Sequence, residues 1–220
     1  MAEPQIAHCS PSTIRGKSRV RHIILASLLA LPASAWAANE TIEPEPVIAA
    51  PVQHHEARPA TRLVTFGFAI GGDNLATRED DVTLDAGDGF YFSVGQLFGS
   101  HNPRLNTQIE IGLKMDSLDA GNGTASIQRF PLTAMVFYSF ETTRIGVGPT
   151  LHIRPIYELD ITSGSNKVVF DNALGLAVQV DYHLNQTFVG IRVENINYHA
   201  APGTAFVDAD SIGLHFGSEF

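Results

Sequence analysis

From residue 62 onward, apolar and polar residues alternate along the chain with a period of two. In one such segment Leu176, Val178 and Val180 fall on one face, whereas Gln179 and Asp181 fall on the other. Such alternation is typical of β-strands with one apolar face, and no segment shows a convincing helical period. The pattern predicts eight strands, approximately at residues 62–71, 89–98, 105–118, 126–140, 143–159, 167–184, 188–198 and 208–220.

Two features place the apolar faces in lipid rather than in a soluble core. Several expected strands exceed ten residues, whereas most strands are about five or six residues long and a tilted membrane-spanning strand needs about 9–11. The polar faces are also rich in glycine, which weakens a solvated strand but fits the crowded interior of a small closed barrel. These glycines are Gly67, Gly95, Gly112, Gly146, Gly148, Gly175, Gly190, Gly213 and Gly217.

The connections between the expected strands alternate in length. The short ones cover residues 99–104, 141–142 and 185–187, and the longer ones cover residues 72–88, 119–125, 160–166 and 199–207. Outer-membrane barrels have short periplasmic turns, longer outer loops and an even number of strands. The sequence therefore predicts an all-β fold, an eight-stranded antiparallel up-and-down transmembrane β-barrel in the bacterial outer membrane. Both ends of the barrel are expected in the periplasm.

The segment before the barrel has the pattern of an export signal followed by a linker. Basic residues precede the apolar run 23–37, which ends in small residues at Ala35 and Ala37. This pattern is typical of a secretory signal peptide, which we assign to residues 1–37. Residues 38–61 contain four prolines and are expected to form an extended periplasmic linker before the barrel at 62–220. The one cysteine, Cys9, falls in the expected signal, so the exported chain is predicted to have no disulfide.

The last expected strand carries the pattern of an assembly signal. Ile212, Leu214, Phe216 and Phe220 share one face, and Ser218 is polar where an apolar residue is usual. The pattern resembles the C-terminal sorting signal of bacterial outer-membrane barrels, which the barrel-assembly machinery reads. Over residues 62–220 the chain resembles the small eight-stranded outer-membrane proteins of Gram-negative bacteria, the class of the OmpA transmembrane domain. This resemblance implies outer-membrane lipid and lipopolysaccharide as partners, together with the assembly machinery during biogenesis.

The face assignment places many charges in a narrow lumen, where they must pair because unpaired buried charges are costly. An Asn122-Gly123 turn would set Asp116 directly opposite Arg129, and the turn near Gln186 would bring Asp181 level with Arg192 or one diagonal step away. We therefore predict the ion pairs Asp116–Arg129 and Asp181–Arg192 and a plugged lumen. The charges expected inside are Lys114, Arg129, Arg144, Arg154, Arg192, Glu110, Asp116, Glu158, Asp181, Glu194 and Glu219.

Candidate chemistry is sparse. The inward histidines His152, His183 and His215 lie at different expected heights and do not predict a shared metal. His199 could belong to a lipid hydrolase, but alanines follow it and Ser211 faces the lumen in the expected register. The acidic loop after the first strand fits calcium binding, divalent-ion bridges to lipopolysaccharide phosphates, or a solvated surface. Its acidic residues are Asp73, Glu79, Asp80, Asp81, Asp85 and Asp88.

The charge of the chain argues against nucleic-acid binding. The net charge is −9, with no basic excess that would favour nucleic acid. We expect no enzyme activity, no cofactor and no metal site. The expected role is structural or at the surface, through envelope integrity, adhesion or ligand contact by the outer loops. Two alternatives stay open: an envelope-lipid (lipid A) hydrolase with a site near His199, and a narrow, porin-like channel for small solutes. The oligomeric state is also open.

Overall fold

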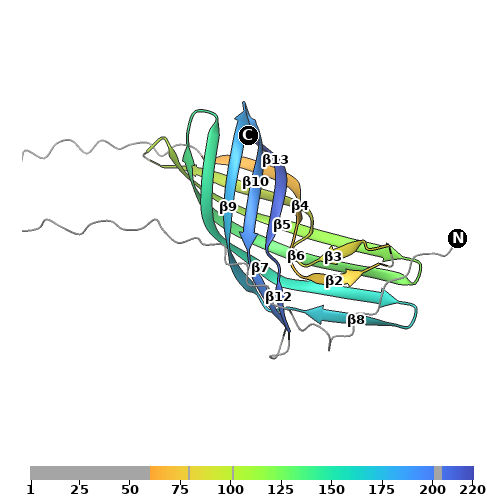
Figure 1. The fold of residues 1–220 in the computed structure, drawn as a ribbon. Coiled ribbons are helices and arrows are strands. Elements are labelled where there is room, and N and C mark those ends of the chain that lie inside the picture. The colour runs from red at the N-terminus through yellow and green to blue at the C-terminus, as the bar shows by residue number, and fades with distance from the viewer. Residues whose placement is uncertain (1–59, 79, 101, 201–204) are drawn as a thin grey trace, which may run out of the picture. The chain divides into compact units, whose positions relative to one another are not determined.

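Eight long strands close into an antiparallel barrel in the computed structural model, which describes residues 60–220 except 79, 101 and 201–204 (Figure 1). The ring closes where β1 pairs with β13, and each of the other strands pairs with its neighbours along the chain. The predicted fold class is therefore confirmed. The barrel strands are β1 (Thr61–Ile70), β4 (Gly89–Gly99), β5 (Leu105–Ala120), β6 (Gly123–Ser139), β7 (Thr143–Ile161), β9 (Ala173–Leu184), β10 (Thr187–Asn195) and β13 (Ser211–Glu219).

The predicted signal peptide at 1–37 and nearly all of the linker at 38–61 lie outside the described residues. Within the described part of the chain, no helix has the length and hydrophobicity needed to cross a membrane.

Five shorter strands lie at the end of the barrel away from Phe220, where the long hairpins β5–β6 and β7–β8 protrude (Figure 1). They are β2 (Asn74–Thr77), β3 (Thr83–Asp85), β8 (Gly164–Val169), β11 (Asn197–Ala200) and β12 (Ala205–Asp208). The sequence predicted loops in most of this region. The single strand predicted at 167–184 is wrong, because the chain leaves the β-ladder after β8 and re-enters it at β9.

The β5–β6 hairpin turns one residue earlier than predicted. Ala120 pairs with Gly123, so the turn consists of Gly121 and Asn122. Gly123 has a φ of 151°, and a Cβ there would collide with the Asp160 carbonyl of β7. The glycine thus serves both a positive φ beside the turn and a close approach of two strands. The register moves by two residues, so Asp116 does not lie directly opposite Arg129.

A β-bulge at Arg154 reverses the faces of β7. The β6–β7 register shifts between Gln128 and Phe130, and Arg154 adopts the left-handed φ of 43°. A bulge adds one residue to one strand, so every later side chain changes sides. Arg154 and Glu158 were predicted in the lumen, but both are exposed. That part of the prediction is wrong because strict alternation was assumed through the bulge.

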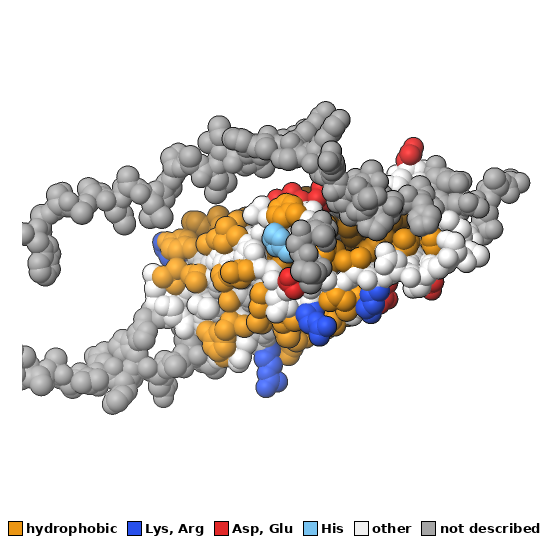
Figure 2. Space-filling model, turned by 90° about the horizontal axis from the view of Figure 1, so that it is seen from below, with side chains coloured by type: hydrophobic (Ala, Val, Ile, Leu, Met, Phe, Trp, Pro, Cys, Tyr) orange, Lys and Arg blue, Asp and Glu red, His pale blue; other side chains and the backbone are white. Residues whose placement is uncertain are grey.

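The barrel wall presents an apolar surface outward (Figure 2). Phe66, Phe92 and Val178 are examples from three strands, each 40% exposed or more. Aromatic side chains gather on the outward face near the C-terminal end, and all are exposed: Phe98, Tyr138, Phe140, Tyr182 and Phe220. An apolar band flanked by aromatic residues is the surface that a membrane barrel presents to lipid.

The polarity of the two faces reverses toward the protruding end. On the outward face of β5, the exposed Met115 is followed by the exposed Ser117 and Asp119. On the inward face, the buried Lys114 gives way to the buried Leu118. In β6 and β7 the same region has polar residues outside and apolar residues inside. The strands therefore extend beyond the lipid-facing wall into a part of the protein whose outer face is polar and whose interior is apolar.

This water-exposed part has a hydrophobic core of its own. We call it the cap, and it comprises β2, β3, β8, β11, β12 and the protruding ends of β5, β6 and β7. Its core fills the interior where the strands pass beyond the lipid-facing wall. The buried core residues are Leu75, Ala76, Leu84, Ala86, Leu118, Ala125, Ile127, Leu159, Phe170, Ala173, Ile196, Tyr198, Val207 and Ala209.

Candidate functional site in the barrel lumen

Arg144 is the centre of a group of ion pairs and aromatic contacts in the lumen near the C-terminal end. Its Nε donates to Asp181 Oδ2 at 2.6 Å, and its Nη1 donates to Glu219 Oε1 at 2.8 Å. The guanidinium also lies over the rings of Phe137 and Phe188, at 4.5 and 4.7 Å from their centroids. The four partners lie on β6, β9, β10 and β13, so one cation on β7 links strands that are not all neighbours in the barrel.

Asp181 and Arg192 do not form the predicted ion pair, and each binds other side chains. Asp181 lies opposite Gly190, one diagonal step from Arg192, and its carboxylate bonds to Arg144 and to His215 Nε2 at 2.7 Å. Arg192 is directly opposite Gln179, and its Nε donates to Gln179 Oε1 at 2.7 Å. Asp181 and Arg192 are diagonal neighbours on adjacent strands, as expected, but each side chain forms its ion pair with another residue.

Arg192 forms the centre of a second group, farther from the C-terminal end. Its Nη2 makes a close ion pair with Glu110 Oε1, and Gln108 Nε2 donates to the other oxygen of Glu110 at 2.9 Å. Gln179, which accepts from Arg192, donates in turn to Asp181 at 2.9 Å. Hydrogen bonds thus link the second group to the Arg144 group without interruption.

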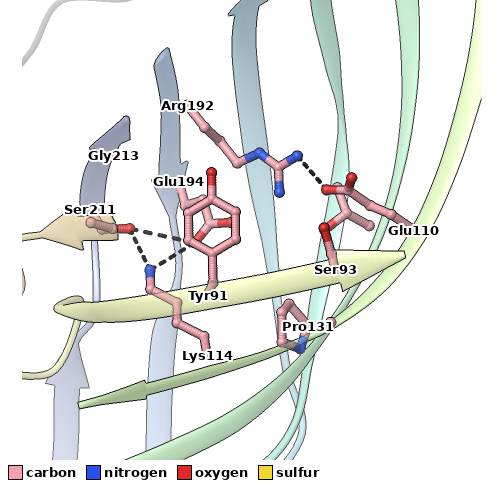
Figure 3. Close-up of a pocket in the computed structure, with 12 residues that line it drawn as sticks. Tyr91, Ser93, Glu110, Lys114, Pro131, Arg192, Glu194, Ser211 and Gly213 are labelled. Atoms are coloured by element: carbon pink, nitrogen blue, oxygen red, sulfur yellow. Dashed lines mark hydrogen bonds and ion pairs between the residues drawn. The ribbon is translucent and has the colours of Figure 1, made fainter. Parts of the chain in front are cut away.

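A third group lies beside the second (Figure 3). Lys114 Nζ donates to Glu194 Oε2 at 3.3 Å and to Ser211 Oγ at 3.1 Å. His152 Nδ1 and the Tyr198 hydroxyl share a hydrogen bond of 2.6 Å, and His152 Nε2 is 3.8 Å from Glu194 Oε2. Because Tyr198 also belongs to the cap core, this group connects the lumen to the cap.

Arg129 makes a second connection to the cap. Its side chain is 0% exposed, and it donates from Nη1 to the Ala86 carbonyl at 2.6 Å and from Nη2 to the Asp88 carbonyl. The predicted pair Asp116–Arg129 is therefore wrong. Directly opposite Arg129 is Lys114, and the guanidinium reaches the segment between β3 and β4 instead of a carboxylate.

A small cavity separates the second and third groups. Its volume is about 20 Å³, and Figure 3 shows the Arg192–Glu110 pair on one side and the Lys114–Glu194 pair on the other. The buried hydroxyls of Tyr91 and Ser93 line it between these pairs. A cavity needs about 10–15 Å³ to hold one water, so this space is water-sized and is no aqueous pore.

The three candidate histidines do not point toward a common metal position. His152 bonds to Tyr198, His215 bonds to Asp181, and the ring of His183 packs against Phe188 at 5.6 Å. Within the described ranges, no group of three or more His, Cys, Asp or Glu side chains could hold a metal ion.

The structure does not bring the candidate residues His199 and Ser211 together. His199 is exposed on β11 and packs edge-on against Phe206, with ring centroids 5.2 Å apart. Ser211 faces the lumen, where its hydroxyl bonds to Lys114 and Glu194. The two side chains therefore have separate partners on separate faces, and the geometry of a hydrolase pair is not formed.

The acidic loop folds into β2 and β3, where its carboxylates bind the chain itself. Asp88 Oδ1 accepts from the Gly71 N–H at 2.6 Å, and Asp73 Oδ2 accepts from the Asp208 N–H at 2.9 Å. A hydrogen bond from Arg78 holds the pKa of Asp80 below its usual value, whereas burial raises the pKa of Asp85. Glu79 lies outside the described residues, and Asp81 adopts a φ of 63° at the tip.

Comparisons with known proteins give structural likeness only. No protein-family model matches the chain. No curated protein matches its sequence. Ail, the attachment invasion locus protein of Yersinia pestis, solved with the heparin analogue sucrose octasulfate, aligns with a TM-score of 0.49 and 11% identity over 73% of this chain and 99% of that one.

Two further solved structures align in the same way. Neisserial surface protein A gives a TM-score of 0.46 and 10% identity, over 74% of this chain and 99% of that one. The N-terminal β-barrel domain of Pseudomonas aeruginosa OprF gives a TM-score of 0.37 and 12% identity, over 75% of this chain and 100% of that one. The fold assignment rests on the closed ring itself. Eight antiparallel strands with an apolar outer wall and a polar lumen are the architecture of a small outer-membrane barrel.

Proposed function

We propose that this protein is a non-catalytic, non-conducting outer-membrane barrel that carries a folded cap as a structural and surface-contact element. The reversal of polarity along β5, β6 and β7 carries this proposal, because it separates a lipid-facing wall from a water-exposed part with its own core. A packed core supports a surface of fixed shape, whereas long unpacked loops would have to be ordered by each partner.

The filled lumen supports a closed barrel rather than a channel. The hydrogen-bonded groups centred on Arg144, Arg192 and Lys114 occupy successive levels, and the cavity between the last two is water-sized. An eight-stranded barrel is just wide enough for side chains to fill its interior. Ion flow would require several of these buried pairs to break together, which is costly in a low-dielectric interior.

Planar-bilayer recording tests the closed lumen. The purified protein should show no stable single-channel steps in concentrated salt. Reproducible steps whose size changes with Arg192→Ala would overturn this part of the proposal and favour the channel alternative.

We further propose that the cap faces the outside of the cell and that Phe220 lies at the periplasmic side. Short turns join the strands at the Phe220 end, as is usual for the periplasmic side of such barrels. In this orientation the outward face of the cap would lie beside the sugars and phosphates of lipopolysaccharide.

Cysteine labelling in intact cells tests this orientation. A membrane-impermeant maleimide should label Ser165→Cys on β8 directly, but Ser100→Cys, in the turn after β4, only after permeabilisation. Both side chains are exposed, and the natural Cys9 belongs to the expected signal peptide. The reverse labelling pattern would contradict the proposal.

The surface-contact role is tested by a binding screen of the refolded barrel against lipopolysaccharide and host-matrix components. Variants with a destabilised cap serve as the comparison. Hydrolysis of lipid A in the same samples, lost with His199→Ala, would instead support the enzyme alternative.

A further inference from the structure

A shallow groove crosses the outward wall at the Phe220 end of the barrel. It has a volume of about 630 Å³ and lies over β1, β4 and β5. Val64, Val94 and Ile111 stand side by side across these strands and line its floor. These side chains are smaller than the phenylalanines of the surrounding wall, so the surface is hollowed at this level.

Bulky aromatic side chains border the hollow at both ends. The next outward rung toward the cap holds Phe66 and Phe92, which lie opposite each other. Toward the chain end, Phe98 and Phe220 line the groove, and both belong to the exposed aromatic band. Such bands mark the level of lipid headgroups. The groove therefore begins at the headgroup level and extends into the hydrocarbon region.

A cation and an amide stand at the headgroup end of the groove. Arg62 lies directly opposite Gln96, and both side chains line the groove on the same outward face as Val64. Two backbone hydrogen bonds of 3.0 Å between Arg62 and Phe220 fix the position of this rung. An arginine at this depth can keep its stem on the apolar wall and direct its guanidinium to the interface.

We propose that this groove is a binding site for one anionic glycerophospholipid. An acyl chain would lie on Val64, Val94 and Ile111, and the headgroup phosphate would bind Arg62 and Gln96. Arginine suits phosphate because its planar fork can donate two parallel hydrogen bonds to the oxygens. The inference rests on the membrane placement of the barrel and is independent of what the cap does.

Native mass spectrometry of the protein purified from outer membranes tests the site. The probes are dioleoyl phosphatidylglycerol and dioleoyl phosphatidylcholine, added separately at equal concentration. We expect one retained phosphatidylglycerol per barrel and weaker retention of phosphatidylcholine. Arg62→Gln should lower phosphatidylglycerol retention on the order of tenfold, as loss of a charge-assisted hydrogen bond implies. Inorganic phosphate should not displace the lipid, because the acyl chain supplies part of the binding.

Two matched controls separate the site from general effects. Arg104→Gln removes another exposed positive charge at the same end, from a side chain bonded to the Tyr138 hydroxyl, and should leave retention unchanged. Val94→Phe fills the groove and should reduce retention of both lipids, whereas Val178→Phe, an outward valine on β9, should not. Heat-modifiable migration on gels shows that each variant is folded.

Three results would overturn the proposal. The first is unchanged retention in folded Arg62→Gln, and the second is an equal loss in Arg104→Gln. The third is a dimer mass that disappears with Val94→Phe, because a second copy would then cover the groove. Arg62→Gln leaves the apolar wall intact, so it decides the question even if Val94→Phe does not fold.

Discussion

Arg144 and Asp181 form an ion pair of 2.6 Å inside the barrel, with residue exposures of 2% and 0%. Asp181→Ala would leave Arg144 with Glu219 alone and would remove the carboxylate that binds His215. Loss of one partner of a buried pair costs about 3–5 kcal/mol. We expect the free energy of unfolding to fall by about this amount, measured by denaturant titration with heat-modifiable gel migration. Glu141→Ala, at an exposed turn, should be neutral, and an equally small effect at Asp181 would contradict the assigned network.

Leu84 tests whether the cap is a packed unit. The side chain is 0% exposed in the cap core, so Leu84→Ala should destabilise the cap by about 2–5 kcal/mol. Hydrogen exchange should accelerate in β2, β3, β11 and β12, while the lipid-facing strands keep their protection. The neighbouring Val82→Ala removes a 41% exposed side chain and serves as the control. Unchanged exchange in Leu84→Ala would show that the core does not hold the cap together.

The bulge at Arg154 predicts that two changes at this position are tolerated. Deletion of Arg154 removes the extra residue of β7, so the ladder can continue without a bulge while Glu158 stays outward and Leu159 stays inward. We expect this variant to fold. Arg154→Gly keeps the bulge and removes a left-handed residue with a Cβ, so it should fold and gain about 1 kcal/mol. Expression with quantified heat-modifiable migration measures both, and loss of folded protein on deletion of Arg154 would refute the bulge.

Asp208 should make the cap more stable in mild acid. Burial, together with the nearby Asp210 carboxylate, raises the pKa of Asp208 above its usual value. A carboxyl with a raised folded-state pKa stabilises the fold below its unfolded pKa of about 3.9 and loses that contribution as pH rises through the folded value. Unfolding of the cap, reported by a fluorophore on Ser165→Cys, should therefore need less denaturant at about pH 7 than at about pH 4.

Asp208→Asn isolates this effect from the other carboxyl groups. The asparagine keeps the size of the side chain and removes the titration, so the difference between variant and wild type should grow as pH rises. A difference that is constant with pH, or that shrinks toward neutral pH, would show that Asp208 does not titrate in this way.

Phe220→Ala tests the predicted assembly signal. Ile212, Leu214, Phe216 and Phe220 are all exposed on the outward face, which is the arrangement that the signal requires. We expect less heat-modifiable protein in the outer membrane and more in the periplasm. Phe206→Ala removes another exposed phenylalanine, from the cap, and should not alter assembly. Equal yields of the two variants would count against the signal.

The barrel could be predicted from the sequence because its signal is local. Alternation at each strand determines both the strand and its outward face, and eight such strands leave one closed arrangement. The bulge was missed because a single inserted residue leaves alternation intact on both sides of Arg154. The cap core was missed because Leu84 and Val207 lie in segments predicted as loops, and Phe170 was assigned to the single strand predicted at 167–184. Only the closed barrel brings them together.

The two ion pairs predicted from the sequence were wrong for a related reason. Sequence arguments paired charges on neighbouring strands, where register can be counted. In the structure, Lys114 of β5 pairs with Glu194 of β10, and Arg144 of β7 pairs with Glu219 of β13. These contacts cross the lumen between strands that are not adjacent, so they depend on the curvature of the whole ring. The set of inward charges was largely correct, but their partners could not be read from register.

The reversal of polarity along β5, β6 and β7 also bears on how the protein could leave the membrane. Withdrawal toward the Phe220 end would draw Asp119 and Asp160 into hydrocarbon, where charged side chains are costly. It would also carry the polar outer surface of the cap through the bilayer unless the cap unfolded first, and unfolding would expose the cap core to water. We therefore expect the cap to hinder withdrawal, so that the lifetime of the inserted barrel depends on the rate at which the cap unfolds. This rate is a kinetic property separate from the equilibrium stability of the wall.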